Sequence, residues 1–352
     1  MQAKDTLVLI GQTGPKSKGI YRFRLQPEGD EVFQNVTLVP LGIAAETPGP
    51  TFFEIDLKRR LLFAVNDVEE FEGKPTGAVS TFGIDPAGKL TLVNQRSSIG
   101  SHPTQLTIAS GGRHLLVANG GNDTLAVFPI GDDGRIGEPT DVVKSAGKSI
   151  TLDASSRFAF ACDFASDRLL TFRFDSAAGT LTPGGPPAMT LKKGAGPRQL
   201  LFRPDGRFAY LLNERQSTIT AFAFDAASGA LTDVQTVFTV PEYFDGPNLA
   251  TELGVHRSGK WLYVSNCGHN SVVLFTIDPA KGSLTYVEEQ GTGGRNPWRF
   301  GIDPASKHLA ISNRDSDTVL ASRIDDGNGR LKPSGIFASL ASPASVRFLP
   351  PL

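Results

Sequence analysis

One pattern, repeated along the chain, constrains the fold more than any other feature. An apolar run that ends in a corner residue occurs seven times, and the corners are Gly11, Asn66, Asn119, Asp163, Asn213, Asn266 and Asn313. Successive corners are separated by 55, 53, 44, 50, 53 and 47 residues. Repeats of this length are typical of β-propeller blades, whereas a β-solenoid has shorter repeats. The pattern therefore predicts seven similar units.

Each unit contains the signals of four short strands. The corner is followed by an alternating run, such as STITAFAFD or SVVLFTID, and period-two alternation indicates a strand. A turn containing Gly then opens a third strand, as at Gly229 and Gly282, and a strand that usually begins with Pro leads to the next corner. We predict an all-β fold: a seven-bladed β-propeller with four antiparallel strands per blade, in one domain spanning residues 1–352.

The two ends of the chain predict how the ring closes. The first unit begins at its second strand, TLVLIG, and the last segment, SPASVRFLP (342–350), is a first strand alone. The C-terminal strand should therefore complete the N-terminal blade. Closure of this kind removes the strand edges that an open array would expose to aggregation.

Composition and charge exclude several partners. Lys and Arg number 35 and Asp and Glu 36, without a long block of one sign, so we expect neither nucleic acid nor an acidic membrane surface as a partner. No segment approaches the roughly 20 apolar residues of a membrane span, and MQAKDTLVLIGQTG lacks the apolar core of a secretory signal. Two cysteines imply no disulfide framework. We expect a cytoplasmic monomer or weak dimer.

The repeat predicts which residues surround the central channel. In an antiparallel blade, the corner after the second strand and the entry to the next blade's first strand lie on the same face of the disc. This face would hold carboxylates, guanidinium groups and amides, which suit a small polar or anionic ligand. The residues concerned are Asp163, Glu214, His269 and Arg314 from the corners, and His102, Lys148, Arg198, Gln199, Glu252, Trp298 and Arg299 from the entries.

Some of these residues have a structural interpretation as well. Asparagines that recur at corners also cap backbone groups. Arg198 could instead form a buried pair with a carboxylate such as Glu214 or Glu252. Glu214 is less easily explained as turn chemistry.

Other chemistries have weaker support in the sequence. There is no HExxH, CxxC or paired-histidine spacing, so we expect no histidine-based metal site and no cofactor. Carboxylate and amide oxygens are ligands of Ca²⁺ and Mg²⁺, so a site for one of these cations stays an open alternative. Cys267 lies two residues before His269, as in a thiol nucleophile, but the corner breaks that geometry and favours an incidental semi-buried thiol. The GxSxG motif and a Walker-type phosphate loop are absent.

Three stretches resemble a known family: LLFAVNDVEEFEGKPTGAVSTFGIDPAGKLTLVNQ (61–95), GAGPRQLLFRPDGRFAYLLNE (194–214) and ELGVHRSGKWLYVSNCGHNSVVLFTID (252–278). They are similar to the seven-bladed lactonase family, which contains bacterial propeller-type 6-phosphogluconolactonases and fungal carboxymuconate lactonizing enzymes. The resemblance covers nearly the whole chain. It implies that Arg198 and Glu214 are the catalytic pair, and that Glu252 and Asp163 match further family positions.

The chain departs from the family pattern at several positions of the channel face. Gln199 replaces a His, Cys267 replaces an Arg, and Trp298 stands where an Arg usually follows Pro, with Arg299 next to it. The stretch AGKSITLD (146–153) stands at the entry where the family has its catalytic His. Lys148 or His102 would have to replace that His.

The resemblance implies metal-independent hydrolysis of a sugar lactone or a related cyclic ester, of the 6-phosphogluconolactonase or carboxymuconate cyclase kind. Glu214 would act as general base and Arg198 as electrostatic stabiliser. The remaining predicted site residues would bind the lactone or another anionic sugar-like ligand: His102, Lys148, Asp163, Gln199, Glu252, His269, Arg299 and Arg314. The alternative is a catalytically degenerate propeller that binds a small ligand or a protein partner on its channel face.

Overall fold

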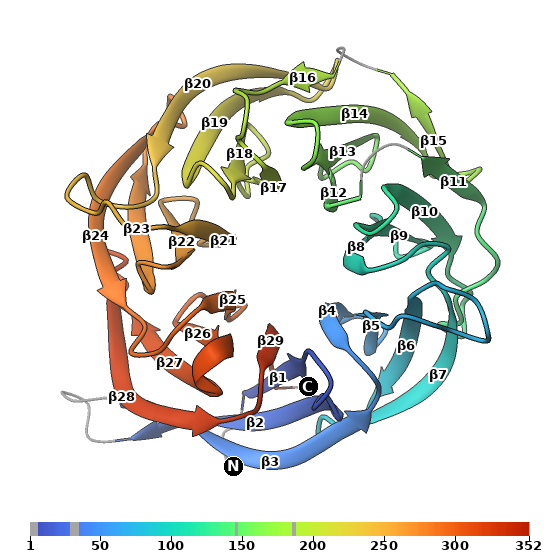
Figure 1. Ribbon diagram of the computed structural model, residues 1–352, viewed down its shortest axis with the longest axis horizontal. Coiled ribbons are helices and arrows are strands. Elements are labelled where there is room, and N and C mark those ends of the chain that lie inside the picture. Colours follow the sequence, from blue (N-terminus) through green and yellow to red (C-terminus); the bar gives the residue numbers. More distant parts are fainter. Residues whose placement is uncertain (1–5, 29–34, 145–146, 185–187, 352) are drawn as a thin grey trace.

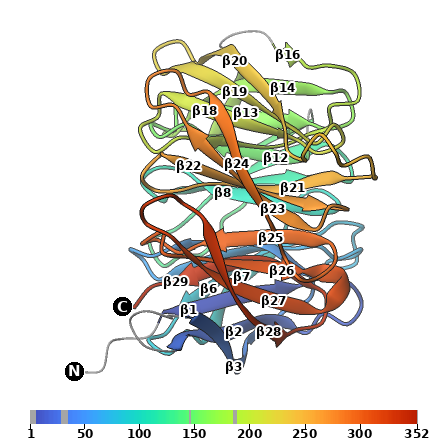
Figure 2. The same cartoon turned by 90° about the vertical axis from the view of Figure 1, so that its left-hand side faces the viewer.

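The computed structural model describes residues 6–28, 35–144, 147–184 and 188–351. Their strands form seven sheets arranged as blades around a central channel, as predicted (Figure 1). The chain passes from the innermost to the outermost strand of one blade and then enters the next blade. In the view turned by 90° (Figure 2), the outer strands of blades six and seven cross the rim of the disc obliquely.

The blades have the following strands, given from the inside outward. Blade one has β29 (Pro343–Leu349), β1 (Leu7–Gln12), β2 (Gly19–Glu28) and β3 (Asn35–Glu46); blade two has β4 (Pro50–Asp56), β5 (Leu61–Asn66), β6 (Ala78–Ile84) and β7 (Leu90–Ser97). Blade three has β8 (Pro103–Ile108), β9 (His114–Asn119), β10 (Thr124–Pro129) and β11 (Asp141–Lys144); blade four has β12 (Ser149–Leu152), β13 (Phe158–Asp163), β14 (Arg168–Asp175), β15 (Thr180–Pro183) and β16 (Met189–Thr190).

The remaining three blades follow the same order. Blade five has β17 (Pro197–Phe202), β18 (Phe208–Asn213), β19 (Thr218–Asp225) and β20 (Ala230–Phe238); blade six has β21 (Leu249–Val255), β22 (Trp261–Cys267), β23 (Ser271–Ile277) and β24 (Leu284–Gly291). Blade seven has β25 (Pro297–Ile302), β26 (His308–Asn313), β27 (Thr318–Ile324) and β28 (Leu331–Ser339), with a short 3₁₀ helix η1 (Arg314–Ser316) after β26.

The second strand of each blade is apolar on both faces. Every residue of β5, β9, β13 and β18 is buried, because neighbouring blades pack against both faces of the sheet. This burial explains why the repeat is recognisable as a continuous apolar run. The outer strands have fewer buried residues, and β20 has none.

Blade four departs from four simple strands. Its outer strand is divided, because β14 pairs with β15 through 172–175 and with β16 through 168–169. The sequence between the two pieces is GGPPA (184–188), of which 185–187 lie outside the described residues.

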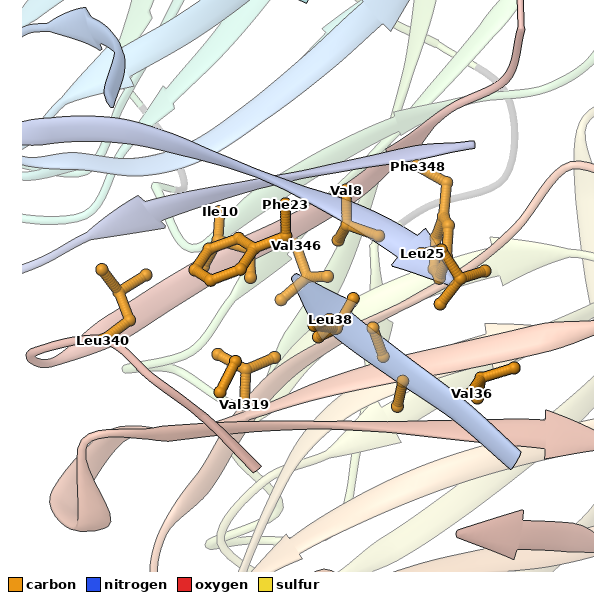
Figure 3. Close-up of a cluster of buried hydrophobic side chains, with 13 residues drawn as sticks. Val8, Ile10, Phe23, Leu25, Val36, Leu38, Val319, Leu340, Val346 and Phe348 are labelled. Carbon is orange, nitrogen blue, oxygen red and sulfur yellow. The ribbon is translucent and has the colours of Figure 1, made fainter. Parts of the chain in front are cut away.

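The C-terminal strand closes the ring as predicted. β29 pairs with β1 in an antiparallel register that places Val8 opposite Phe348 and Ile10 opposite Val346. Figure 3 shows these side chains grouped with Val319 of blade seven, and all of them are buried. The last strand therefore belongs to the first blade and also packs against the seventh. Within the described ranges, no helix is long and apolar enough to cross a membrane.

Candidate active site

Strand pairing brings the corners and the strand entries together at one end of the channel. The first residue of an inner strand lies opposite the last residue of the second strand, as in Pro197 with Asn213 and Pro297 with Asn313. The predicted channel face is therefore formed by the start of each inner strand and the corner beside it.

A β-bulge near the start of the inner strands changes which side chains reach the channel. The register shifts between Pro197 and Gln199 and between Pro297 and Arg299, and the same shift occurs in blades two, three and six. A bulge breaks the strict alternation of a strand and redirects side chains. As a result, the sequence neighbours Arg198 and Gln199 both line one pocket, and so do Trp298 and Arg299.

This channel pocket has a volume of about 180 Å³. Within the described part of the chain, its lining has four cationic side chains, from Lys148, Arg198, Arg299 and Arg314, and one carboxylate, from Asp67. The other lining residues are Thr13, Thr51, Pro103, Thr104, Gln105, Ser149, Gln199 and Trp298. The pocket therefore offers a polar, cation-rich environment to a small ligand.

Arg198, Glu214 and Lys148 form a buried cluster beside the pocket. The Arg198 side chain is 3% exposed, and its Nη1 donates a hydrogen bond to Glu214 Oε2 while its Nε donates to the Thr251 carbonyl oxygen. Lys148 Nζ lies 3.4 Å from the same Glu214 oxygen. Arg198 therefore forms a buried ion pair with Glu214, which is the structural alternative considered from the sequence. It also lines the pocket.

The cluster shifts the pKa values of two of its members. Burial by itself would raise the pKa of Glu214, but Arg198 and Lys148 outweigh burial and hold the pKa below its ordinary value. Burial, and next the Arg198 charge, lower the pKa of Lys148 to about 8, although Glu214 opposes them. The lysine therefore titrates near pH 8, well below its ordinary range, and Glu214 stays ionised.

A second buried cluster joins Arg299, Glu252 and Gln199. Arg299 Nη1 donates to Glu252 Oε2 at 2.5 Å, and Gln199 Nε2 lies 3.4 Å from the other carboxylate oxygen. Gln199 Oε1 accepts a hydrogen bond from the Leu253 amide at 2.9 Å. Among the described residues, Arg299 Nε and Thr51 Oγ1 have no hydrogen-bond partner although both atoms are buried. Buried polar atoms are usually bonded, so these two are exceptions beside the pocket that Arg299 and Thr51 line.

Trp298 links two arginines at the edge of the pocket. The guanidinium carbons of Arg198 and Arg314 lie 4.7 and 4.1 Å from the centroid of its ring. Both distances are in the range of cation–π contacts. Arg314 also makes a loose ion pair, 3.3 Å from Nε to Asp315 Oδ1, and its side chain is 30% exposed.

Five predicted site residues lie outside the described lining of the pocket. Glu214 and Glu252 belong to the two buried clusters beside it, and the other three are His102, Asp163 and His269. His102 is 60% exposed, and its Nδ1 lies 3.0 Å from Oδ1 of the lining residue Asp67. Asp163 pairs with Arg168 at 2.7 Å. His269 hydrogen-bonds to Ser271 Oγ at 2.7 Å.

Sequence reasoning did not select several lining residues as ligand contacts, namely Thr13, Thr51, Thr104 and Ser149. Thr51 and Thr104 follow the proline that opens an inner strand, as Arg198 does in blade five. Alignment of the strand entries by their prolines would have shown this correspondence. Gln105 and Gln199 are likewise equivalent, since each accepts a hydrogen bond from the backbone of the next blade.

The corner asparagines have the structural role that their recurrence suggests. Their Nδ2 atoms donate to carbonyl oxygens of the preceding connection, as in Asn119 to Ser98 at 2.9 Å and Asn266 to Thr239 at 2.7 Å. Asn66 and Asn313 make equivalent bonds. These side chains are fully buried and tie each corner to the connection beside it.

The thiol of Cys267 does not meet a base. Burial raises its pKa to about 11, and its Sγ lies 3.6 Å from Thr251 Oγ1, whereas the His269 ring bonds to Ser271. Among the described residues, no group of three or more His, Cys, Asp and Glu side chains could hold a metal ion. The first residue of the predicted blade-four entry, Ala146, lies outside the described residues.

Comparison with known proteins identifies the family. A model of the seven-bladed β-propeller lactonases matches residues 7–348. The 6-phosphogluconolactonase of Bacillus subtilis is 27% identical over 346 residues, which are 95% of each chain, and that of Pectobacterium carotovorum is 30% identical over 337 residues, 95% of this chain and 96% of the relative. The structure of a periplasmic gluconolactonase from Pseudomonas aeruginosa superposes with a TM-score of 0.89 at 28% identity, covering 99% of this chain and 100% of the other. The protein therefore belongs to the seven-bladed β-propeller lactonase family.

Proposed function

We propose that this protein hydrolyses the ring ester of an anionic sugar lactone in the channel pocket, and that 6-phosphogluconolactone is the first candidate substrate. The observation that carries the proposal is the set of four cationic side chains around a pocket of about 180 Å³. The relatives named 6-phosphogluconolactonase support the choice of substrate.

The pocket supplies the electrostatic part of such a reaction. Attack of water on a lactone carbonyl places negative charge on the carbonyl oxygen, and preorganised donors that meet this charge lower the barrier. Arg198 suits the task because its Nε and Nη1 are held by Thr251 and Glu214 while the side chain still lines the pocket. Glu214 is paired with two cations and has a lowered pKa. It therefore suits the positioning of Arg198 and Lys148 better than the base role that the resemblance implied.

Arg299 and Arg314 are the candidates for binding the anionic group of the substrate. Arg314 is partly exposed and loosely paired, and Arg299 lines the same pocket. Guanidinium groups bind phosphate and carboxylate by paired hydrogen bonds. A neutral gluconolactone is the second candidate, favoured by the likeness to the Pseudomonas gluconolactonase.

A titration of acid release, corrected for spontaneous hydrolysis, tests the proposal on 6-phosphoglucono-δ-lactone and glucono-δ-lactone. We expect kcat/KM to be about tenfold or more higher for the phosphorylated lactone, the effect of one extra charge-assisted contact of roughly 1.4 kcal/mol. Arg198→Met should lower kcat by about 10²–10³-fold, and Arg198→Lys, which keeps the charge, should lose less. A folded wild-type protein that hydrolyses neither lactone would show the proposal to be wrong.

The alternatives receive less support. A catalytically degenerate binder would have a closed channel mouth and an exposed apolar patch around Trp298, whereas here a pocket adjoins Trp298 and two guanidinium groups lie on its ring. The named relatives favour lactone hydrolysis over carboxymuconate cyclisation. A cytoplasmic location stays a prediction, since the Pseudomonas structure is of a periplasmic protein. A monomer or weak dimer is likewise still a prediction.

A further inference from the structure

We propose that Lys148 is the general base of the reaction: its uncharged Nζ takes a proton from the water molecule that attacks the lactone carbonyl. This inference rests on the proposed function, and it assigns the proton transfer within the same pocket to one side chain.

The position of Lys148 suits this role. The residue directly precedes β12, lines the channel pocket and keeps 24% of its side chain exposed. Its Nζ lies 3.4 Å from Glu214 Oε2 and 4.4 Å from the centroid of the Phe164 ring. The amine is therefore held between a carboxylate and an apolar ring, with access to the pocket.

The charges around Lys148 favour loss of its proton. Glu214 is shared with Arg198, so one negative charge faces two cations. Burial and a neighbouring cation both disfavour an ammonium ion, which agrees with the lysine pKa of about 8. About a tenth of the amine is then uncharged at pH 7 and half at pH 8. The titratable and charged groups near it are Arg198, Glu214 and Arg299, with Cys162, Asp163 and Arg215 on neighbouring segments.

The other titratable groups near the pocket suit the base role less well. Glu214 is not among the described lining residues and is ion-paired twice. His102 is mostly exposed and does not itself line the pocket. Asp67 lines the pocket, but its Oδ1 lies 3.0 Å from the ring Nδ1 of His102 and is engaged by that contact.

Lys148 carries out both proton transfers of the reaction. As the water oxygen bonds to the carbonyl carbon, Nζ accepts one water proton and becomes an ammonium ion, and Arg198 stabilises the oxyanion. The intermediate then breaks the bond between the acyl carbon and the ring oxygen. The ammonium ion returns its proton to the departing alkoxide, so one lactone and one water give one hydroxy acid and the free amine.

The wild type and two variants distinguish a general base from a positive charge alone. For the wild type, kcat/KM should rise with pH with a midpoint near 8. Lys148→Arg keeps the charge but cannot lose a proton at these pH values, so we expect kcat to fall by about 100-fold or more while KM changes by less than about threefold. Lys148→His should keep part of the activity, and its midpoint should move down by about one pH unit or more, toward the ordinary pKa of imidazole near 6.5.

A second measurement does not depend on turnover. The rate at which an amine-reactive reagent labels Lys148 in the folded wild type, followed by mass spectrometry across pH, should have its midpoint near 8. A midpoint above 10 would overturn the proposal, as would a Lys148→Arg variant with wild-type kcat. A wild type that hydrolyses neither lactone would instead overturn the proposed function, and this assignment with it.

Discussion

At the scale of single residues, Glu214 is the side chain on which both stability and chemistry depend. Glu214→Gln leaves the buried Arg198 without its counter-charge, so we expect unfolding to cost about 3–5 kcal/mol less. The same change removes the carboxylate that raises the pKa of Lys148, so the midpoint of the activity profile should move to lower pH. Denaturant unfolding and kcat/KM against pH measure the two effects.

The matched control for this prediction is Glu288→Gln. Glu288 pairs with Arg330, whose side chain is 52% exposed, and such surface pairs contribute at most about 1 kcal/mol. If Glu214→Gln abolished the pH dependence and left only a trace of activity, Glu214 would be the base itself and its positioning role would be wrong.

Arg314 carries a second residue-level prediction, about substrate choice. Arg314→Met removes a partly exposed guanidinium group that lines the pocket, and KM for the phosphorylated lactone should rise about tenfold with kcat nearly unchanged. The rate with the neutral lactone should stay within about twofold, because this substrate has no anionic group for Arg314 to bind. Arg330→Met, in the turn between β27 and β28, is the control. An equal loss with both lactones would contradict the prediction.

The sequence could predict part of this site and not the rest. The repeat places Lys148, Arg198 and Arg299 on the channel face, and all three line the pocket. It places Asp163 and His269 there too, but Arg168 and Ser271, each a few residues along the chain, bond to them instead. The choice of a local partner depends on side-chain geometry, which a repeat of apolar runs does not contain.

At the scale of elements, the bulges at the inner strands are what the sequence could not predict. Strict alternation would place Arg198 and Gln199 on opposite faces of β17, yet both line the pocket because the register shifts between 197 and 199. The proline at the start of these strands was visible in the sequence, whereas the extra residue after it depends on pairing with the second strand.

The closing strand β29 carries the prediction at this scale. Val346 is fully buried between blades one and seven, so Val346→Asp places a carboxylate in an apolar cluster and should destabilise the fold by more than about 3 kcal/mol. Ile336→Asp on β28 is the control, because that side chain is 46% exposed and should change stability by at most about 0.5 kcal/mol. Urea unfolding checks both variants, and equal stabilities would show that β29 is not needed for closure.

At the scale of the whole molecule, the ring was the most predictable feature. Seven apolar runs and the corners between them predict seven blades, because each run must be covered on both faces by its neighbours. The divided outer strand of blade four was not predicted, since the outermost strand contributes little apolar burial and leaves a weak signal. The sequence signals for a binding partner and for a cellular compartment are weak as well.

The ring also explains how a single site is built from distant parts of the chain. The channel pocket takes lining residues from blades one, two, three, four, five and seven, and its buried clusters are completed by Glu214 and Glu252. The site could be predicted on one channel face because each blade contributes its corner and its strand entry to that face. Any lactone bound there contacts several blades at once.

Lactone hydrolysis in the channel pocket is tested most directly by kcat/KM of the purified wild-type protein for 6-phosphoglucono-δ-lactone at pH 8, beside Arg198→Met. We predict a value of about 10⁴ M⁻¹s⁻¹ or more for the wild type and a loss of at least about 100-fold in the variant. Hydrolysis no faster than the spontaneous reaction, or equal rates for the two folded proteins, would show that the pocket is not the site of this reaction.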